Sequence, residues 1–166
     1  MPIIDAYSNI VKAVLLIIGL TTSLLCVAQT PWNKATQAPG VRDITVYRSE
    51  SCGCCGDWLE HLRQHNFNVT DNKVLDMGAI KKRFGVPVQL ASCHTAIIGG
   101  YVIEGHVPAD DIKRLLRDKP EVAGLSVPEM PVGTPGMEMG ERKDPFSVIW
   151  FKKSGQADIY RRYEDY

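Results

Sequence analysis

The chain lacks an excess of charge of either sign. Its 19 Lys and Arg residues balance 19 Asp and Glu residues, so the formal net charge is zero at pH 7, and no basic stripe follows any segment. Proteins that bind nucleic acid typically carry such a stripe or patch, so the composition argues against nucleic acid as a partner. The sequence also lacks internal repeats, and its 166 residues suffice for one domain with one core.

The N-terminus lacks an apolar run long enough for a typical transmembrane helix. Residues 13–27 carry no charge, but a spanning helix needs roughly 20 apolar residues. Lys12 precedes this run and Ala28 follows it, a pattern typical of a secretory signal peptide. We therefore expect residues 1–28 to be removed on export to the periplasm. The alternative is an uncleaved leader that anchors the protein in the membrane through residues 13–28.

The rest of the sequence predicts an α/β domain after a flexible lead-in at residues 29–42. Apolar periodicity and turn signals predict the order β-α-β-α-β-β-α, at residues 44–47, 56–66, 67–70, 79–84, 95–98, 101–104 and 109–117. Gly99-Gly100 is typical of a β-hairpin turn. With cysteines after the first strand, this is the order of a thioredoxin-like domain, which we expect at residues 43–118. Such a domain should have parallel strands in the middle of its sheet and helices on both faces.

The C-terminal part, residues 119–166, has a different composition. Residues 119–144 are rich in Pro, Gly and Met, which predicts an irregular loop. Two β-type runs at residues 146–151 and 159–163 flank Gly155 and predict a C-terminal β-hairpin. We expect this loop and hairpin to pack on the thioredoxin-like core.

Three cysteines stand within four residues, Cys52-Gly53-Cys54-Cys55. An exported protein meets an oxidising compartment, where thiols are metal-bound, disulfide-bonded or actively reduced. A helix N-terminus stabilises a thiolate, so the C-x-x-C pair predicts Cys52 as a redox nucleophile and Cys55 as its resolving thiol. Cys54 would compete in such an exchange, but it adds a third thiolate for a metal ion. A structural disulfide is a further alternative.

A second group of candidate ligands follows later in the sequence. Cys93 and His94 precede the strand at residues 95–98, at a sheet edge expected to face the cysteines. Neighbours in a strand point to opposite faces, so only one of the two points inward unless the segment is irregular. His106 is either a ligand or a cap for the helix that begins at Pro108. His61 and His65 on the first helix are expected to be solvated.

Three methionines lie within ten residues, at Met130, Met137 and Met139. Thioethers are soft ligands that select Cu(I) and offer little to zinc. Helical core packing does not explain methionine in a Pro/Gly loop, although it can serve as a flexible filler. Met130 and Met137 are therefore predicted ligands, and Met139 is a further candidate.

Four motifs in this order resemble the CopG-like copper-resistance proteins, an exported bacterial family long described as having unknown function. They are Cys-Gly-Cys-Cys-Gly-Asp-Trp at 52–58, Ser-Cys-His-Thr-Ala at 92–96, Gly-Tyr-Val-Ile-Glu-Gly-His-Val-Pro at 100–108 and Pro-Val-Gly-Thr-Pro-Gly-Met-Glu at 131–138. The resemblance spans residues 44–145 and implies a thioredoxin-like domain that binds copper and handles its redox state. It maps the family's metal ligands onto Cys52, Cys54, Cys55, Cys93, His94, Met130 and Met137. One departure is Glu129, where the family pattern has glycine.

The sequence thus predicts a periplasmic protein for copper tolerance that binds Cu(I) through a Cys/His/Met cluster. Its expected partners are copper ions and other periplasmic copper-handling proteins. Three thiols and a methionine-rich loop favour copper over zinc, and the middle cysteine disfavours simple dithiol exchange. A thiol-disulfide oxidoreductase is the first alternative and a structural zinc domain is the second. A combined role, in which thiolates exchange electrons with bound copper, would make the protein a copper oxidoreductase.

Overall fold

The structure is a computed structural model that describes residues 32, 40 and 42–166. The predicted signal peptide, and with it the alternative membrane anchor, lies outside the described residues, as does most of the predicted lead-in. Among the described residues, no helix combines the length and the apolar character that a membrane span requires.

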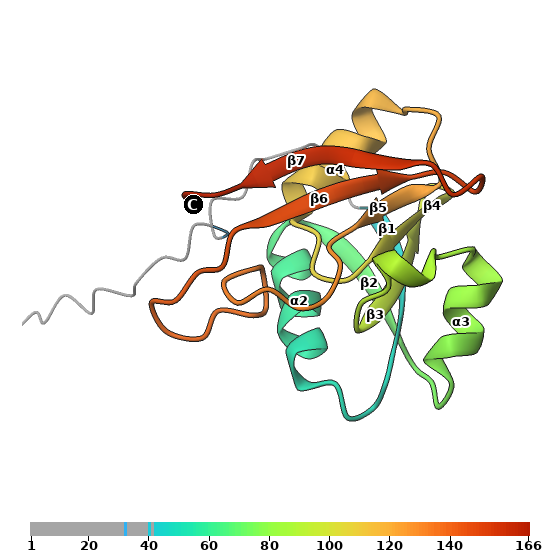
Figure 1. Cartoon of the computed structure of the whole chain (residues 1–166). Coiled ribbons are helices and arrows are strands. Elements are labelled where there is room, and N and C mark those ends of the chain that lie inside the picture. The colour runs from blue at the N-terminus through green and yellow to red at the C-terminus, as the bar shows by residue number, and fades with distance from the viewer. Residues whose placement is uncertain (1–31, 33–39, 41) are drawn as a thin grey trace, which may run out of the picture.

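The described part of the chain forms one sheet with helices on both faces (Figure 1). Its elements are β1 (Arg42–Arg48), α2 (Gly53–Gln64), β2 (Phe67–Lys73), α3 (Met77–Phe84), the 3₁₀ helix η2 (Val88–Leu90), β3 (His94–Ile98), β4 (Tyr101–Glu104), α4 (Ala109–Asp118), β5 (Gly124–Ser126), β6 (Phe146–Phe151) and β7 (Ala157–Tyr163).

The sheet has seven strands in the order β2-β1-β3-β4-β5-β6-β7. β1 pairs parallel with β2, and β4 pairs parallel with β5, whereas β1–β3 and β3–β4 are antiparallel. The prediction of parallel strands in the middle of the sheet is therefore wrong. Part of the reason is that a tight hairpin joins β3 to β4, and the two strands of a hairpin are necessarily antiparallel. Gly99 and Gly100 at its turn have φ of 55° and 86°, as a type I′ turn requires.

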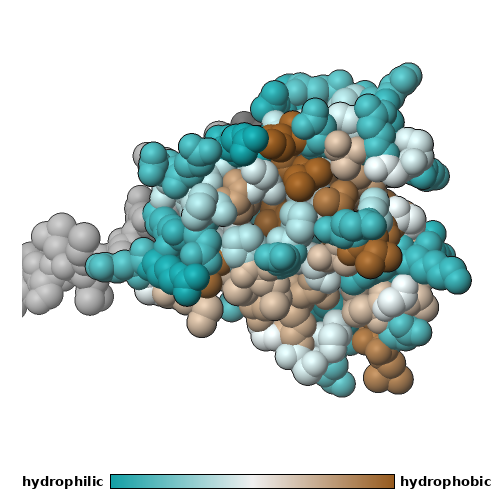
Figure 2. Space-filling view, viewed as in Figure 1, coloured by the Kyte–Doolittle hydropathy of each residue, from teal (hydrophilic) through white to brown (hydrophobic). Residues whose placement is uncertain are grey.

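The α/β, thioredoxin-like prediction is confirmed: β1 to β4 with α2, α3 and α4 follow the expected order. α2 and α4 bury Trp58, Leu62 and Ile112 in the larger core cluster on one face of the sheet. α3 contributes Phe84 to a second, smaller cluster on the other face, around Val102. Figure 1 shows α2 and α3 on opposite sides of the sheet. Figure 2 shows apolar side chains gathered over the sheet within a mainly hydrophilic surface.

The C-terminal hairpin continues the sheet edge to edge. Residues Gly124–Ser126, which the sequence predicts as loop, form the short strand β5 between β4 and β6. A Cβ atom on Gly124 would lie 1.9 Å from the carbonyl oxygen of Val102, so only glycine allows this close pairing. β5 joins the hairpin β6–β7 to the core and delimits an excursion at residues 127–145, which we call the Met loop.

Candidate metal centre

The three clustered cysteines lie at the start of α2. The helix begins at Gly53 with Cys52 as its N-cap, three residues before the predicted start at Gly56. Cys52 and Cys55 form a disulfide with their Cα atoms 5.4 Å apart. Cys54 is a free thiol whose Sγ atom lies 3.7 Å from that of Cys52. The predicted C-x-x-C pair is therefore formed, with the third sulfur beside it.

Arg48 holds the turn that leads into these cysteines. Its Nε and Nη2 atoms donate to the two carboxylate oxygens of Asp71 at 2.9 and 2.8 Å, and its Nη1 donates to the carbonyl of Cys52 at 3.3 Å. Bidentate pairing of this kind fixes the guanidinium plane. Sequence reasoning missed Arg48, because its role depends on the pairing of β1 with β2.

Cys93 lies at a bend just before β3 and faces two imidazoles. Its Sγ atom is 3.1 Å from Nδ1 of His94 and 3.2 Å from Nε2 of His106. Cys93 and His94 both face the site because this segment is irregular and does not follow strand alternation. Burial raises the pKa of the Cys93 thiol to about 12, and the neighbouring Cys54 adds to the increase. The thiol is thus protonated unless a cation compensates the buried thiolate.

The orientation of His106 leaves one nitrogen available to a metal. Its Nδ1–H donates to the carbonyl of Pro135 at 2.8 Å, so Nε2 carries the lone pair that faces Cys93. Metal-binding histidines commonly donate their other ring N–H to a backbone carbonyl in this way. Of the two predicted roles for His106, the helix cap is wrong, because the Ala109 N–H at the start of α4 donates to His61 instead.

His94 is fully buried next to His106 and the indole of Trp58. Its ring centroid lies 4.3 Å from that of Trp58 and 5.0 Å from that of His106. Burial is the main cause that lowers the pKa of both histidines. Both imidazoles are therefore neutral at pH 7, which is the form that binds metal ions.

Glu104 fixes the backbone around Cys93. Its fully buried carboxylate accepts hydrogen bonds from Lys81, from the Ser92 N–H at 2.7 Å and from the Thr95 hydroxyl at 2.6 Å. These contacts hold the residues on both sides of the Cys93–His94 pair. Sequence reasoning missed this role, although an acidic residue within the apolar run Tyr-Val-Ile-Glu was a visible signal.

The two groups of ligands form one cluster because Cys93 belongs to both. The sulfurs of Cys52, Cys54, Cys55 and Cys93 all lie within 4.8 Å of one another. One ligand atom from each of Cys93, His94 and His106 also meets this limit. The structure therefore brings together every cysteine and histidine predicted as a ligand, from three separate segments of the chain.

The Met loop follows the edge of this cluster. Glu129 adopts φ of 61°, a conformation that favours the glycine expected there, and its carbonyl accepts from the Ser92 hydroxyl. This contact brings the backbone before Met130 to the Cys93 segment. Further along, a Cβ atom on Gly136 would lie 2.5 Å from the backbone nitrogen of Trp58, so the backbone before Met137 touches α2.

The exposure of the three methionines differs. Met130 and Met139 are 49% and 66% exposed, whereas Met137 is partly buried. Met130 and Met137 follow directly the two residues that contact the cluster segments, and Met139 lies beyond them. Their role as thioether ligands remains a prediction.

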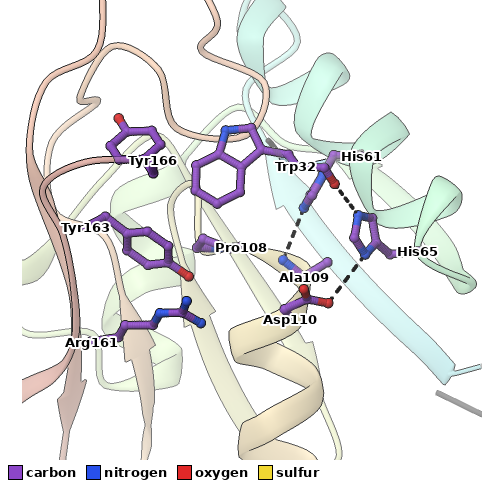
Figure 3. Close-up of a pocket in the computed structure, with 9 residues that line it drawn as sticks. All are labelled: Trp32, His61, His65, Pro108, Ala109, Asp110, Arg161, Tyr163 and Tyr166. Atoms are coloured by element: carbon purple, nitrogen blue, oxygen red, sulfur yellow. Dashed lines mark hydrogen bonds and ion pairs between the residues drawn. The ribbon is translucent and has the colours of Figure 1, made fainter. Parts of the chain in front are cut away.

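The prediction that His61 and His65 are solvated is wrong, because both are buried between α2 and α4. His65 donates from Nε2 to the carbonyl of Trp32 at 2.6 Å and accepts from Lys113 at Nδ1 (3.1 Å). The two histidines line a cavity of about 190 Å³ (Figure 3). Their ring nitrogens serve the packing of α4 and of Trp32 and face no sulfur ligand.

Comparison with known proteins supports a copper-related family. The family described as "Protein of unknown function, DUF411" matches residues 90–137. No curated protein matches the chain. A solved structure of copper resistance protein CopG (form 1) is 49% identical, with a TM-score of 0.71, and the match covers 74% of this chain and 98% of that chain. A second one (form 2) is 47% identical, with a TM-score of 0.72, and covers 75% and 100%.

These matches extend over nearly the whole length of both CopG structures at close to half identity. Together with the Cys/His cluster, they indicate a role in copper handling. The chain belongs to the CopG-like family of copper-resistance proteins.

Proposed function

We propose that this protein binds Cu(I) in the periplasm and thereby contributes to copper tolerance. The ligands are the sulfurs of Cys52, Cys54, Cys55 and Cys93, the imidazoles of His94 and His106, and the thioethers of Met130 and Met137. The observation that carries this proposal is the position of Cys93, which joins four sulfurs and two imidazoles in one cluster. Thiolate, thioether and imidazole together are a donor set suited to Cu(I), and thioethers disfavour zinc.

The Cys52–Cys55 disulfide connects metal binding to redox chemistry. The disulfide must take up two electrons and two protons before both sulfurs are available as thiol ligands. Copper can drive the opposite reaction. Two Cu(II) ions oxidise the thiols of Cys52 and Cys55 to the disulfide, two protons are released and two Cu(I) ions form. The free thiols of Cys54 and Cys93 then remain next to the Cu(I) produced. This is the redox activity we propose for the site.

The test of copper binding is a competition titration. Anaerobic, fully reduced protein should take Cu(I) from a colorimetric Cu(I) chelator, and the triple variant Cys52→Ser, Cys54→Ser, Cys55→Ser should not. Met77→Leu is a control, because Met77 lies at the start of α3, which contributes no residue to the Cys/His cluster. Copper binding retained undiminished by the triple variant would refute the assignment.

The disulfide itself favours a second candidate function, thiol-disulfide exchange through Cys52. A metal-free protein of this kind should oxidise a dithiol substrate in many turnovers when a small-molecule disulfide is supplied as the electron acceptor. For the copper function, reduced protein given Cu(II) without oxygen should yield one disulfide for every two Cu(I) ions. Turnover of protein dithiols with no Cu(I) formed would put the oxidoreductase first.

Export is tested by the mass of the protein in the cell. Cleavage after Ala28 predicts a mature chain that begins at Gln29 and is released with the periplasmic fraction. Intact mass spectrometry should show this species. Full-length protein in the membrane fraction would contradict cleavage and support the membrane-anchored alternative.

A further inference from the structure

Trp32 is held in the folded core by residues that are distant from it in the sequence. Its side chain is only 8% exposed, and its ring centroid lies 5.4 Å from that of Tyr163 and 5.2 Å from that of Tyr166. Figure 3 shows the indole between these two tyrosines on one side and His61 and His65 on the other. An aromatic side chain held on both sides provides a rigid support.

The polar atoms of Trp32 connect two different parts of the molecule. Its indole N–H donates to the carbonyl of Gly133 in the Met loop at 2.8 Å. Its backbone carbonyl accepts from His65 on α2 at 2.6 Å. Trp32 therefore links the Met loop to the helix that carries the clustered cysteines.

Gly133 lies at the base of the turn that contains Met137. The Gly133 N–H donates to the carbonyl of Met137, and the Met137 N–H donates to the carbonyl of Thr134, both at 2.8 Å. Gly133 has φ of 93°, and a Cβ atom there would lie 2.8 Å from the hydroxyl of Tyr166. The carbonyl of Gly133 is thus held by the indole while its amide holds Met137.

The opposite side of the same turn contacts the metal cluster. Pro135 accepts the Nδ1–H of His106, and Gly136 touches the backbone of Trp58. The turn at residues 133–137 is therefore fixed from two sides, by His106 and α2 on the cluster side and by Trp32 on the other.

We infer that Trp32 is a positioning residue for the copper site: its indole N–H holds the Met loop so that Met137 reaches the Cys/His cluster. This inference rests on the proposed copper function. Trp32 itself contacts no ligand of the cluster and acts through Gly133. In the predicted mature chain, which begins at Gln29, Trp32 is the fourth residue.

The test uses Trp32→Phe, which keeps an aromatic ring and removes the indole N–H. Tyr101→Phe is the matched control, because it also removes one hydrogen bond to a backbone carbonyl, that of Pro120, at a distance from the Met loop. Without copper, amide hydrogen exchange at Gly133 and Met137 should be at least about tenfold faster in Trp32→Phe than in the parent or the control. Unchanged exchange would overturn the inference whether or not the protein binds copper.

The second readout follows the methionines directly in protein labelled with ¹³C at the methionine methyl groups. Adding Cu(I) without oxygen should shift the Met137 methyl signal in the parent and in Tyr101→Phe. In Trp32→Phe this shift should be lost and Cu(I) affinity should fall about tenfold, the usual size of an outer-shell effect. A Met137 signal that shifts equally in Trp32→Phe would overturn the inference. Parent protein that binds Cu(I) without any Met137 shift would overturn it too, whereas a reduced parent that binds no Cu(I) would refute the proposed function itself.

Discussion

The molecule contains two pairs of buried histidines, and they have opposite chemical surroundings. The ring centroids of His61 and His65 are 4.5 Å apart, and those of His94 and His106 are 5.0 Å apart. Burial lowers the pKa of all four. His61 and His65 use their nitrogens on backbone groups and on Lys113, whereas His94 and His106 each direct a nitrogen at the sulfur of Cys93.

This difference separates a structural histidine pair from a candidate metal site. Burial and spacing are similar in the two pairs, so neither property identifies ligands. What identifies them is the kind of group that each ring nitrogen faces. In the first pair these groups connect α2 to α4 and to Trp32. In the second pair the group is the sulfur of Cys93, a soft ligand that could hold a metal ion together with both imidazoles.

The largest effect should come from removing one imidazole of each pair in turn. His106→Asn should lower Cu(I) affinity of the reduced protein at least about tenfold, because it removes the Nε2 lone pair next to Cys93. His61→Leu should leave affinity within about twofold of the parent, since its nitrogens face no ligand. The measurement is competition with a Cu(I) chelator. Equal losses of Cu(I) affinity in the two variants would contradict the assignment of His106 as a ligand and of His61 as a structural residue.

The second prediction concerns the stability of the metal-free protein. His61→Leu keeps the side chain's bulk but leaves the buried N–H of Ala109 without its acceptor. The free energy of unfolding should fall by about 1–3 kcal/mol. Urea denaturation measures this, with Glu60→Ala as a control on the exposed side of the same helix, expected within about 0.5 kcal/mol of the parent. A His61→Leu protein as stable as the control would contradict the capping role.

The third prediction is a pH dependence that His61 contributes. Burial, with the nearby His65, Lys113 and His106, lowers the pKa of His61 from 6.5 to about 3. Between these values the unfolded state binds one more proton than the folded state. The contribution of His61 to the free energy of unfolding is therefore fully present above pH 6.5. It is lost as pH falls towards 3, by up to about 1.4 kcal/mol per pH unit.

His61→Leu lacks this titration, so its stability curve should be shallower than that of the parent by that slope. Urea denaturation of both metal-free proteins from pH 7 to pH 4 provides the comparison. Parallel curves would show that His61 titrates alike in the folded and unfolded states.

The smallest effect on stability is expected from replacing the thioethers. The double variant Met130→Leu, Met137→Leu keeps size and apolar character, so its stability should change by less than about 1.5 kcal/mol. Cu(I) affinity should fall, while the reactivity of Cys52 towards a disulfide reagent in the metal-free protein should not change. Met77→Leu controls for substitution alone. If the double variant binds copper like the parent, the site consists of Cys and His only.

Much of the fold could be predicted from local sequence patterns. The strands around Gly99-Gly100, the helix after Pro108 and the C-terminal hairpin all lie close to their predicted positions. β5 could not be predicted, because Gly124–Ser126 is three residues long and becomes a strand only through its two neighbours in the sheet. The early start of α2 was missed for a related reason: Cys52 caps the helix without a side-chain hydrogen bond, so no capping signal stands in the sequence.

The candidate site could likewise be predicted only in part. Soft ligands at short spacing, such as Cys52 to Cys55, can be recognised in a sequence because the residue types alone indicate their chemistry. The surroundings of His61 and His65 depend on Trp32 and α4, which are distant in sequence, so their burial could not be read from the apolar stripe of α2. The supporting contacts of Arg48 and Glu104 likewise appear only once the strands are paired.

Copper K-edge X-ray absorption on anaerobic, Cu(I)-loaded protein is the most direct test of the Cys/His/Met site, because it reports the atoms around the metal. We expect a shell dominated by sulfur, with an imidazole contribution that His106→Asn reduces and His61→Leu leaves unchanged. A shell of nitrogen and oxygen alone, or an imidazole contribution that depends on His61 and not on His106, would contradict it.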